Sequence, residues 1–235
     1  MNNWRWSAKK KKILCIAVTV ILFSCLAVIG CAPTRLYSVN MNYDAEKAVV
    51  PAYLKAGDKV PASTIAVAEF GDVRQVDDQM VIGRVVEKDG MKTLVVPKHT
   101  KPTQAVAAGI KSYLVKAGYK ISGSIAKWDL KEETMPKSNA KIIIGGNIEE
   151  LELTCRTGFP TDSYKAKMKF TLVIADAAKG KILYRSSVES NSSLEHVSFS
   201  EARLEKQINI ALGEAIEKIF EDRKIARSLK EAMIE

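Results

Sequence analysis

The sequence predicts an α+β fold in which two main helices pack on one face of a largely antiparallel sheet. Two observations lead to this prediction. Strand-like segments come in neighbouring pairs separated by short turns, and two groups of strands are each followed by a segment with helical apolar spacing. A third observation is an apolar run near the N-terminus of the 235-residue chain, which separates a leader from the sequence that folds.

The leader has the parts of a bacterial secretory signal peptide. Residues 1–12 carry five basic side chains and no acidic one, and residues 13–29 are apolar apart from Thr19 and Ser24. A run of this length is near the lower limit of about 17 residues for a membrane-spanning helix. Length alone therefore also allows an uncleaved transmembrane segment.

The end of the apolar run favours cleavage. The sequence Val28-Ile29-Gly30-Cys31 resembles the lipobox of bacterial lipoproteins, in which the cysteine is acylated and becomes the first mature residue. A second candidate, Leu22-Phe23-Ser24-Cys25, fits less well because Phe23 is bulky and the cut would leave apolar residues exposed. We therefore expect a cleaved signal peptide over residues 1–30 and an acylated Cys31.

Cleavage changes the charge and the cysteine content that matter for function. Loss of the five leader charges lowers the formal net charge from +9 to +4, and no basic cluster interleaved with aromatic residues remains. Nucleic acid is therefore not an expected partner. With Cys31 acylated, Cys155 is the remaining thiol, and we expect it to be a half-buried strand residue rather than a residue with a redox or intermolecular role.

Residues 31–63 are predicted to form a lipidated N-terminus and a flexible tether. They are rich in Pro, Asn and Lys, lack a sustained period, and as a coil would span about 30 Å. Two apolar pairs, Val49-Val50 and Tyr53-Leu54, are candidates for packing on the domain. Residues 64–235 are then expected to form one periplasmic α+β domain.

The first half of that domain contains a hairpin and a helix. Residues 64–70 are rich in β-branched types and predict a strand, and Asp89-Gly90 between apolar runs predicts a hairpin turn. Apolar residues at helical spacing follow Pro102, and Gly118 is expected to end that helix. A short strand over 119–121 and a polar insert over 122–139 come next.

The second half reads as three strands and a terminal helix. Residues 141–153 predict a strand in which Gly145-Gly146 indicates a bulge or a close backbone approach. Residues 164–174 alternate apolar and polar side chains, and 182–188 return antiparallel. The sequence Ser198-Phe199-Ser200-Glu201 has the spacing of a capping box, so we expect a helix from there to about residue 219 and a shorter one over 223–233.

This arrangement resembles the YajG family of bacterial lipoproteins. The resemblance covers residues 64–229 and includes the phrases Val95-Val96-Pro97 and Lys116-Ala117-Gly118-Tyr119. It implies a position in the cell envelope and an α+β architecture, and it implies no defined activity. The layout is also similar to small envelope lipoproteins that assist lipid or lipopolysaccharide transport. The chain departs from the family pattern in its longer tether and its longer insert.

Residues able to carry chemistry are few, so we expect no enzyme activity, metal or cofactor. His99 and His196 both sit beside predicted helix starts, without a cysteine or second histidine at ligand spacing, so surface or capping roles are favoured over zinc. Strand alternation places Glu149 on the opposite face from Glu150 and Glu152, which favours a solvated strand over an acid/base pair.

Three lysines form the candidate contact surface. Lys165, Lys167 and Lys169 are expected on one strand face about 7 Å apart, where they could meet anionic lipid headgroups or lipopolysaccharide phosphates. The alternative is that they keep the sheet soluble and discourage edge pairing, and we favour this alternative.

The expected function is that of a non-catalytic envelope lipoprotein that binds a protein or lipid partner. Ala32 after the cysteine lacks the aspartate associated with inner-membrane retention, so we expect the anchor in the periplasmic leaflet of the outer membrane. Two alternatives stay open: an envelope hydrolase with dispersed catalytic residues, and a periplasmic domain on an uncleaved single-pass anchor.

Overall fold

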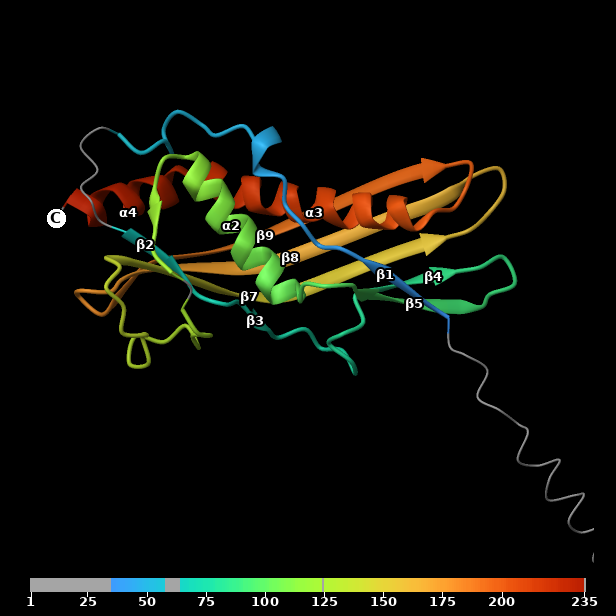
Figure 1. Ribbon diagram of the computed structural model, residues 1–235, viewed down its shortest axis with the longest axis horizontal. Helices are drawn as coiled ribbons and strands as arrows, with labels where there is room; N and C mark the ends of the chain where they lie inside the picture. The colour runs from blue at the N-terminus through green and yellow to red at the C-terminus, as the bar shows by residue number, and fades with distance from the viewer. Residues whose placement is uncertain (1–34, 58–63, 124, 235) are drawn as a thin grey trace, which may run out of the picture. The chain divides into compact units, whose positions relative to one another are not determined.

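The computed structural model describes residues 35–57, 64–123 and 125–234, and the chain from Leu36 onward forms one unit (Figure 1). Its strands are β1 (Leu36–Val39), β2 (Thr64–Val67), β3 (Gly71–Asp72), β4 (Gly83–Val86), β5 (Lys92–Pro97), β6 (Lys120–Ile121), β7 (Ile142–Arg156), β8 (Asp162–Asp176) and β9 (Lys181–His196). Its helices are the 3₁₀ turn η1 (Ala45–Lys47) and the α-helices α2 (Pro102–Lys116), α3 (Glu201–Glu221) and α4 (Arg223–Ile234).

Strand β7 organises the sheet. Along one side it pairs antiparallel with β8, which pairs antiparallel with β9. Along its other side it takes three short parallel partners in succession, β2, β3 and β4. Strand β4 turns back into β5, and β1 runs parallel to β5 at the edge. The sheet is mixed, but its long pairings are antiparallel, so the predicted sheet type is confirmed.

The helices cover one face of this sheet, which we call the inner face. Helix α3 packs on β8 and β9, α2 packs on α3 and β2, and α4 contacts β7, β8 and β9 (Figure 1). The predicted apolar faces are buried in the main core: Ala166, Met168, Phe170, Leu172 and Ile174 from β8, and Leu204, Ile208, Leu212, Ala215, Ile216 and Ile219 from α3. Each fully buried large apolar side chain contributes about 1.5–3 kcal/mol. The predicted α+β class is confirmed.

The polar insert over 122–139 covers part of the opposite face, which we call the outer face. Trp128 and Leu130 are buried there against Ile143 and Val173, in a second and smaller apolar cluster. The indole Nε1 of Trp128 donates to the carbonyl of Lys131 at 2.8 Å, so the buried ring has its polar atom paired. The insert therefore closes the outer face at the end where β7 begins.

The glycine pair in β7 allows aromatic rings to approach the strand from both faces. A Cβ on Gly145 would lie 2.9 Å from Cε3 of Trp128, and one on Gly146 would lie 2.2 Å from Cε1 of Phe70. Phe70 in turn packs edge-on against Phe170, with ring centroids 5.8 Å apart. The predicted close approach is confirmed, while the bulge of β7 lies further along, between Ile148 and Glu150.

The predicted start of the domain at residue 64 is wrong, because the fold already begins at Leu36. Strand β1 pairs with β5, and this strand and the segment that follows it bury apolar side chains in the main core: Val39, Met41, Tyr43, Ala48 and Leu54. Of the two apolar pairs expected to pack, Leu54 is buried, Val50 and Tyr53 are partly buried, and Val49 is exposed. The predicted tether is thus part of the domain over residues 36–57.

Turns and caps follow the sequence signals with one exception. Gly90 in the β4–β5 turn and Gly118 after α2 have φ of 85° and 93°, as the hairpin and helix-end predictions require. The predicted capping box is displaced: Ser200, not Ser198, caps α3, its Oγ accepting from the backbone N–H of Arg203 at 3.3 Å. The carbonyl of Ser198 instead accepts from Nη1 of Arg203 at 2.7 Å, which holds Ser198 outside the helix.

The leader lies outside the described residues, as do Cys31 and the rest of residues 1–34. Within the described part of the chain, no helix has the length and apolar character needed to cross a membrane.

Candidate binding surface

The outer face carries the three predicted lysines. Strand β8 presents Lys165, Lys167 and Lys169 there, between acidic and polar side chains of β7 and β9. The register brings these side chains together across the sheet. Facing the lysines are Glu149, Glu150, Glu152 and Thr154 from β7, and Glu189, Asn191 and Ser193 from β9.

Two of the three lysines are ion-paired within this face. The Nζ of Lys167 lies 2.6 Å from a carboxylate oxygen of Glu150 and 3.3 Å from one of Glu189. The Nζ of Lys169 lies 3.2 Å from Glu149. Hydrogen bonding to Glu150 and then to Glu189 raises the pKa of Lys167. The described residues include no ion-pair partner for Lys165, so one ammonium group in the row is left to meet an external anion.

The predicted placement of Glu149 is wrong. Alternation was expected to put it opposite Glu150, but the bulge between Ile148 and Glu150 inserts one residue, so both glutamates reach the lysines of the outer face. A hydrogen bond from Thr171, followed by one from Lys169, lowers the pKa of Glu149. The acidic residues are therefore members of charge pairs across strands, the solvated-strand role that was expected of them.

A hollow of about 680 Å³ lies at the far end of the outer face. Lys165 and Lys167 line it together with Arg156 and polar residues of β9. It contains hydroxyl, amide and charged groups that could form hydrogen bonds with a polar ligand.

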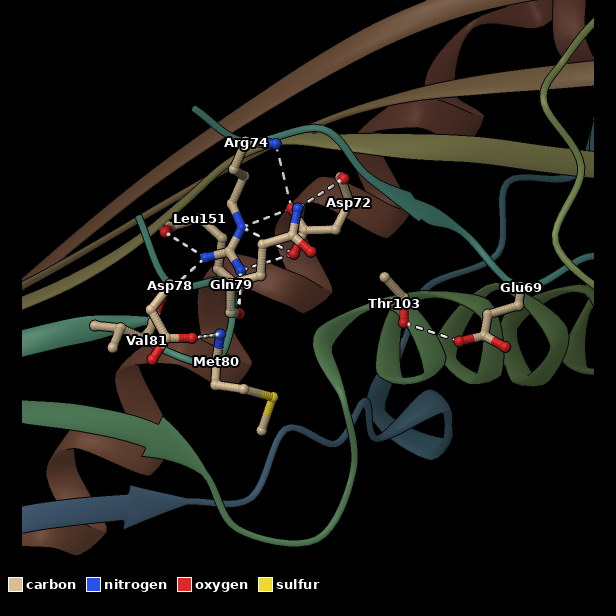
Figure 2. A network of polar contacts seen from close by, with 9 residues as sticks. All are labelled: Glu69, Asp72, Arg74, Asp78, Gln79, Met80, Val81, Thr103 and Leu151. Atoms are coloured by element: carbon tan, nitrogen blue, oxygen red, sulfur yellow. Dashed lines mark hydrogen bonds and ion pairs between the residues drawn. The ribbon is translucent and has the colours of Figure 1, made fainter. Parts of the chain in front are cut away.

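A buried ion pair that the sequence did not signal organises the neighbouring loop. The side chain of Arg74 is 2% exposed, and its guanidinium pairs with the Asp72 carboxylate at 2.7 Å (Figure 2). It also donates to the carbonyls of Gln79 at 2.6 Å, Val81 at 3.2 Å and Leu151 at 3.5 Å. One side chain thus joins both ends of the loop to β7. An arginine in a polar segment is usually exposed, so the local sequence does not indicate that Arg74 is buried.

The loop held by Arg74, which we call the 72–82 loop, borders a second hollow that is larger than the first. A space of about 900 Å³ lies between the loop, β4 and β7, and Val76 and Leu94 are among its lining residues. Both side chains are exposed, as is Met80 on the same loop. A fixed loop that presents apolar side chains beside a hollow is suited to binding another molecule without rearranging.

The remaining candidate residues have structural surroundings. His99 is exposed, and Nδ1 of His196 accepts from the backbone N–H of Ser198 at 3.2 Å in the turn before α3. Cys155 is fully buried, and burial raises the pKa of its thiol to about 11. The described residues bring together no group of three His, Cys, Asp or Glu side chains that could hold a metal ion.

A family model described as uncharacterised lipoprotein matches residues 63–230. The chain belongs to this lipoprotein family. The match begins beside β2 and ends within α4, so it covers the sheet and helices but leaves out β1 and η1. Lipoproteins of this kind are associated with the cell envelope through their anchor.

Solved structures with a similar layout have very different sequences. Protein XCC0632 from Xanthomonas campestris is 11% identical and covers 83% of this chain and 98% of its own, with a TM-score of 0.48. Lipoprotein GNA1162 from Neisseria meningitidis is 10% identical and covers 68% of this chain and 99% of its own, with a TM-score of 0.35. Sequence identities and TM-scores this low assign no function to the chain. None of the curated proteins matches this chain.

Proposed function

We propose that the mature protein begins at an acylated Cys31 and is held on the periplasmic face of the outer membrane, where its domain binds a protein or lipid partner without catalysis. The observation that carries this proposal is the lipoprotein family match over residues 63–230 behind the sequence Val28-Ile29-Gly30-Cys31. The likeness to YajG-type envelope lipoproteins supports the same reading. Stable attachment generally takes more than one acyl chain, which a lipoprotein N-terminus supplies.

Binding is favoured over catalysis by the side chains around the hollows. A hydrolase needs a nucleophile, a base and an orienting group within hydrogen-bond reach of one another. The outer face instead matches lysines with glutamates, and the arginine that fixes the 72–82 loop has its donors committed to Asp72 and backbone carbonyls. These arrangements suit a stable surface for recognition.

Mass spectrometry of the N-terminus of protein purified from cell membranes tests the anchor. The expected result is a first residue Cys31 carrying lipid, and a Cys31→Ala variant that is no longer processed at this position. Cys25→Ala is the matched control, because it removes a cysteine of the same leader and should leave processing unchanged. An intact Met1 on the membrane-bound protein would establish the single-pass alternative and overturn the proposal.

Membrane sorting is tested separately by density separation of inner and outer membranes. The wild-type protein is expected in the outer-membrane fraction, and Ala32→Asp is expected to move it toward the inner membrane. Wild-type protein that already sits in the inner membrane would refute the sorting part of the proposal and leave the anchor itself intact.

A further inference from the structure

Four strongly exposed apolar side chains come from four separate segments of the domain. Phe159 is 92% exposed, Val197 76%, Met91 59% and Leu36 55%. They lie in the β7–β8 turn, after β9, in the β4–β5 turn and at the start of β1. Isolated exposed apolar residues are ordinary, but a group of them at one place marks a site of interaction.

The strand register places these four positions at one end of the sheet. Leu36 of β1 pairs with Leu94, two residues after the start of β5, and the first residue of β5 pairs with the last of β4. That last residue, Val86, pairs with Arg156 at the end of β7, so the β4–β5 and β7–β8 turns project from the same end. The start of β8 pairs with His196, the last residue of β9, which brings Val197 to that end too. Figure 1 shows the two turns and the end of β9 together.

This end also has a rigid aromatic base and basic side chains at its rim. The ring of Phe199 packs against Tyr37, with centroids 5.0 Å apart, and stacks on Tyr164 at 6.4 Å. Lys88, Lys92 and Arg156 are exposed in or beside the turns, together with the acidic residues Asp89 and Glu195. Exposed apolar tips with basic residues beside them are a feature of surfaces that rest in the headgroup layer of a membrane.

The length of chain before β1 limits which end of the domain can approach the membrane. Cys31 precedes Leu36 by five residues, and five residues span at most about 18 Å when fully extended. If Cys31 is acylated, as the proposed function states, the start of β1 stays within that distance of the anchor. The four apolar side chains share the end of the sheet from which this short link departs.

We propose that this end of the domain, defined by Leu36, Met91, Phe159 and Val197, rests in the headgroup region of the bilayer that holds the lipid anchor. The inference builds on the proposed anchor at Cys31. A bilayer fits better than a folded partner because the four side chains stand on separate tips, and none of them lines either hollow on the outer face. Docking at this end leaves the outer face and the 72–82 loop free to meet a partner.

The test places a spectroscopic label at single engineered cysteines in the full lipidated protein. The variants are Phe159→Cys and Val197→Cys at the proposed docking end. The controls are Val49→Cys and Val115→Cys, which are 78% and 57% exposed near the end of α2, at the other end of β7. The native Cys155 is buried and does not compete for the label.

The labelled proteins are reconstituted in vesicles of phosphatidylethanolamine and phosphatidylglycerol, and collisions with a lipid-soluble and a water-soluble quencher are compared. We expect the ratio of lipid to water quenching to be several-fold higher at positions 159 and 197 than at 49 and 115. Exposed positions tolerate substitution, and unchanged thermal unfolding of each variant confirms that it is folded.

Two results would overturn the inference without touching the anchor. Equal quenching ratios at all four positions, in protein whose Cys31 is shown by mass spectrometry to carry lipid, would mean that the domain does not dock. If labels at positions 159 and 197 are protected from both quenchers, this end is covered by protein, either a second copy of the chain or a different one. Failure of the anchor itself would appear differently, as protein without lipid on Cys31.

Discussion

Removing the guanidinium of Arg74 should destabilise the domain strongly. In Arg74→Met the aliphatic volume is largely kept, but the Asp72 carboxylate, only 10% exposed, loses its partner. Breaking a buried ion pair from one side typically costs about 3–5 kcal/mol. The carbonyls of Gln79 and Val81 also lose a donor, at about 1 kcal/mol each or more. Domains of this kind have a free energy of unfolding of about 5–15 kcal/mol, so the variant should lose a large share of it.

Urea unfolding followed by tryptophan fluorescence measures this loss, because Trp128 is buried and is the one tryptophan beyond the leader. Arg84→Met is the matched control: Arg84 pairs with Glu152 at 3.1 Å, but both side chains are about half exposed. An exposed pair is worth at most about 1 kcal/mol. The slope of the unfolding free energy against urea concentration should be the same for both variants. If Arg74→Met then shifts the urea midpoint no further than Arg84→Met, the buried network around Arg74 does not stabilise the domain as proposed.

Three further outcomes follow from packing and burial. Gly146→Ala should cost about 1–3 kcal/mol through overpacking, whereas Gly123→Ala, with nothing within 4 Å of its added Cβ, should leave the urea midpoint unchanged. Cys155 should resist a thiol reagent at pH 8 in the folded protein and react after unfolding, since burial raises its pKa to about 11; rapid labelling of the folded protein would contradict this. Burial also raises the pKa of Tyr113 and Tyr119 to about 12, above the unfolded value of about 10. The folded protein therefore releases the two phenolic protons at a higher pH than the unfolded chain does. The stability that the neutral tyrosines contribute to the folded state is complete below pH 10 and is lost between pH 10 and about 12. Urea midpoints that stay constant between pH 10 and about 12 would contradict this expected loss of stability.

Segments with a sustained period were predictable from the sequence. In β8 and α3 the burial of side chains repeats with the period of the backbone, so the apolar pattern identifies both the element and its inner face. The hairpin turn at Gly90 and the helix end at Gly118 were also predictable, because both positions have a positive φ, which favours glycine. These features depend on neighbours in the chain and therefore appear in local sequence.

The features that sequence reasoning missed depend on distant partners. The segment after β1 has no period, although it buries several side chains in the main core, such as Tyr43 beside Tyr113 of α2. The bulge that turns Glu149 to the outer face leaves no residue signature, since an extra residue is visible only against the paired strand. The burial of Arg74 likewise depends on carbonyls of its loop and of β7.

The contact between α3 and the residue that follows β1 has a consequence for the order of folding. The backbone N–H of Asn40 donates to Glu205 at 2.9 Å, and the side chain of Asn209 donates to the Asn40 carbonyl at 3.0 Å, across more than 160 positions of sequence. Contacts between such distant positions slow folding. Asn40, directly after the first strand, gains these partners only after almost the whole chain has been synthesised. If the chain is exported through the proposed signal peptide, this late pairing favours export of an unfolded polypeptide and assembly of the core at the destination.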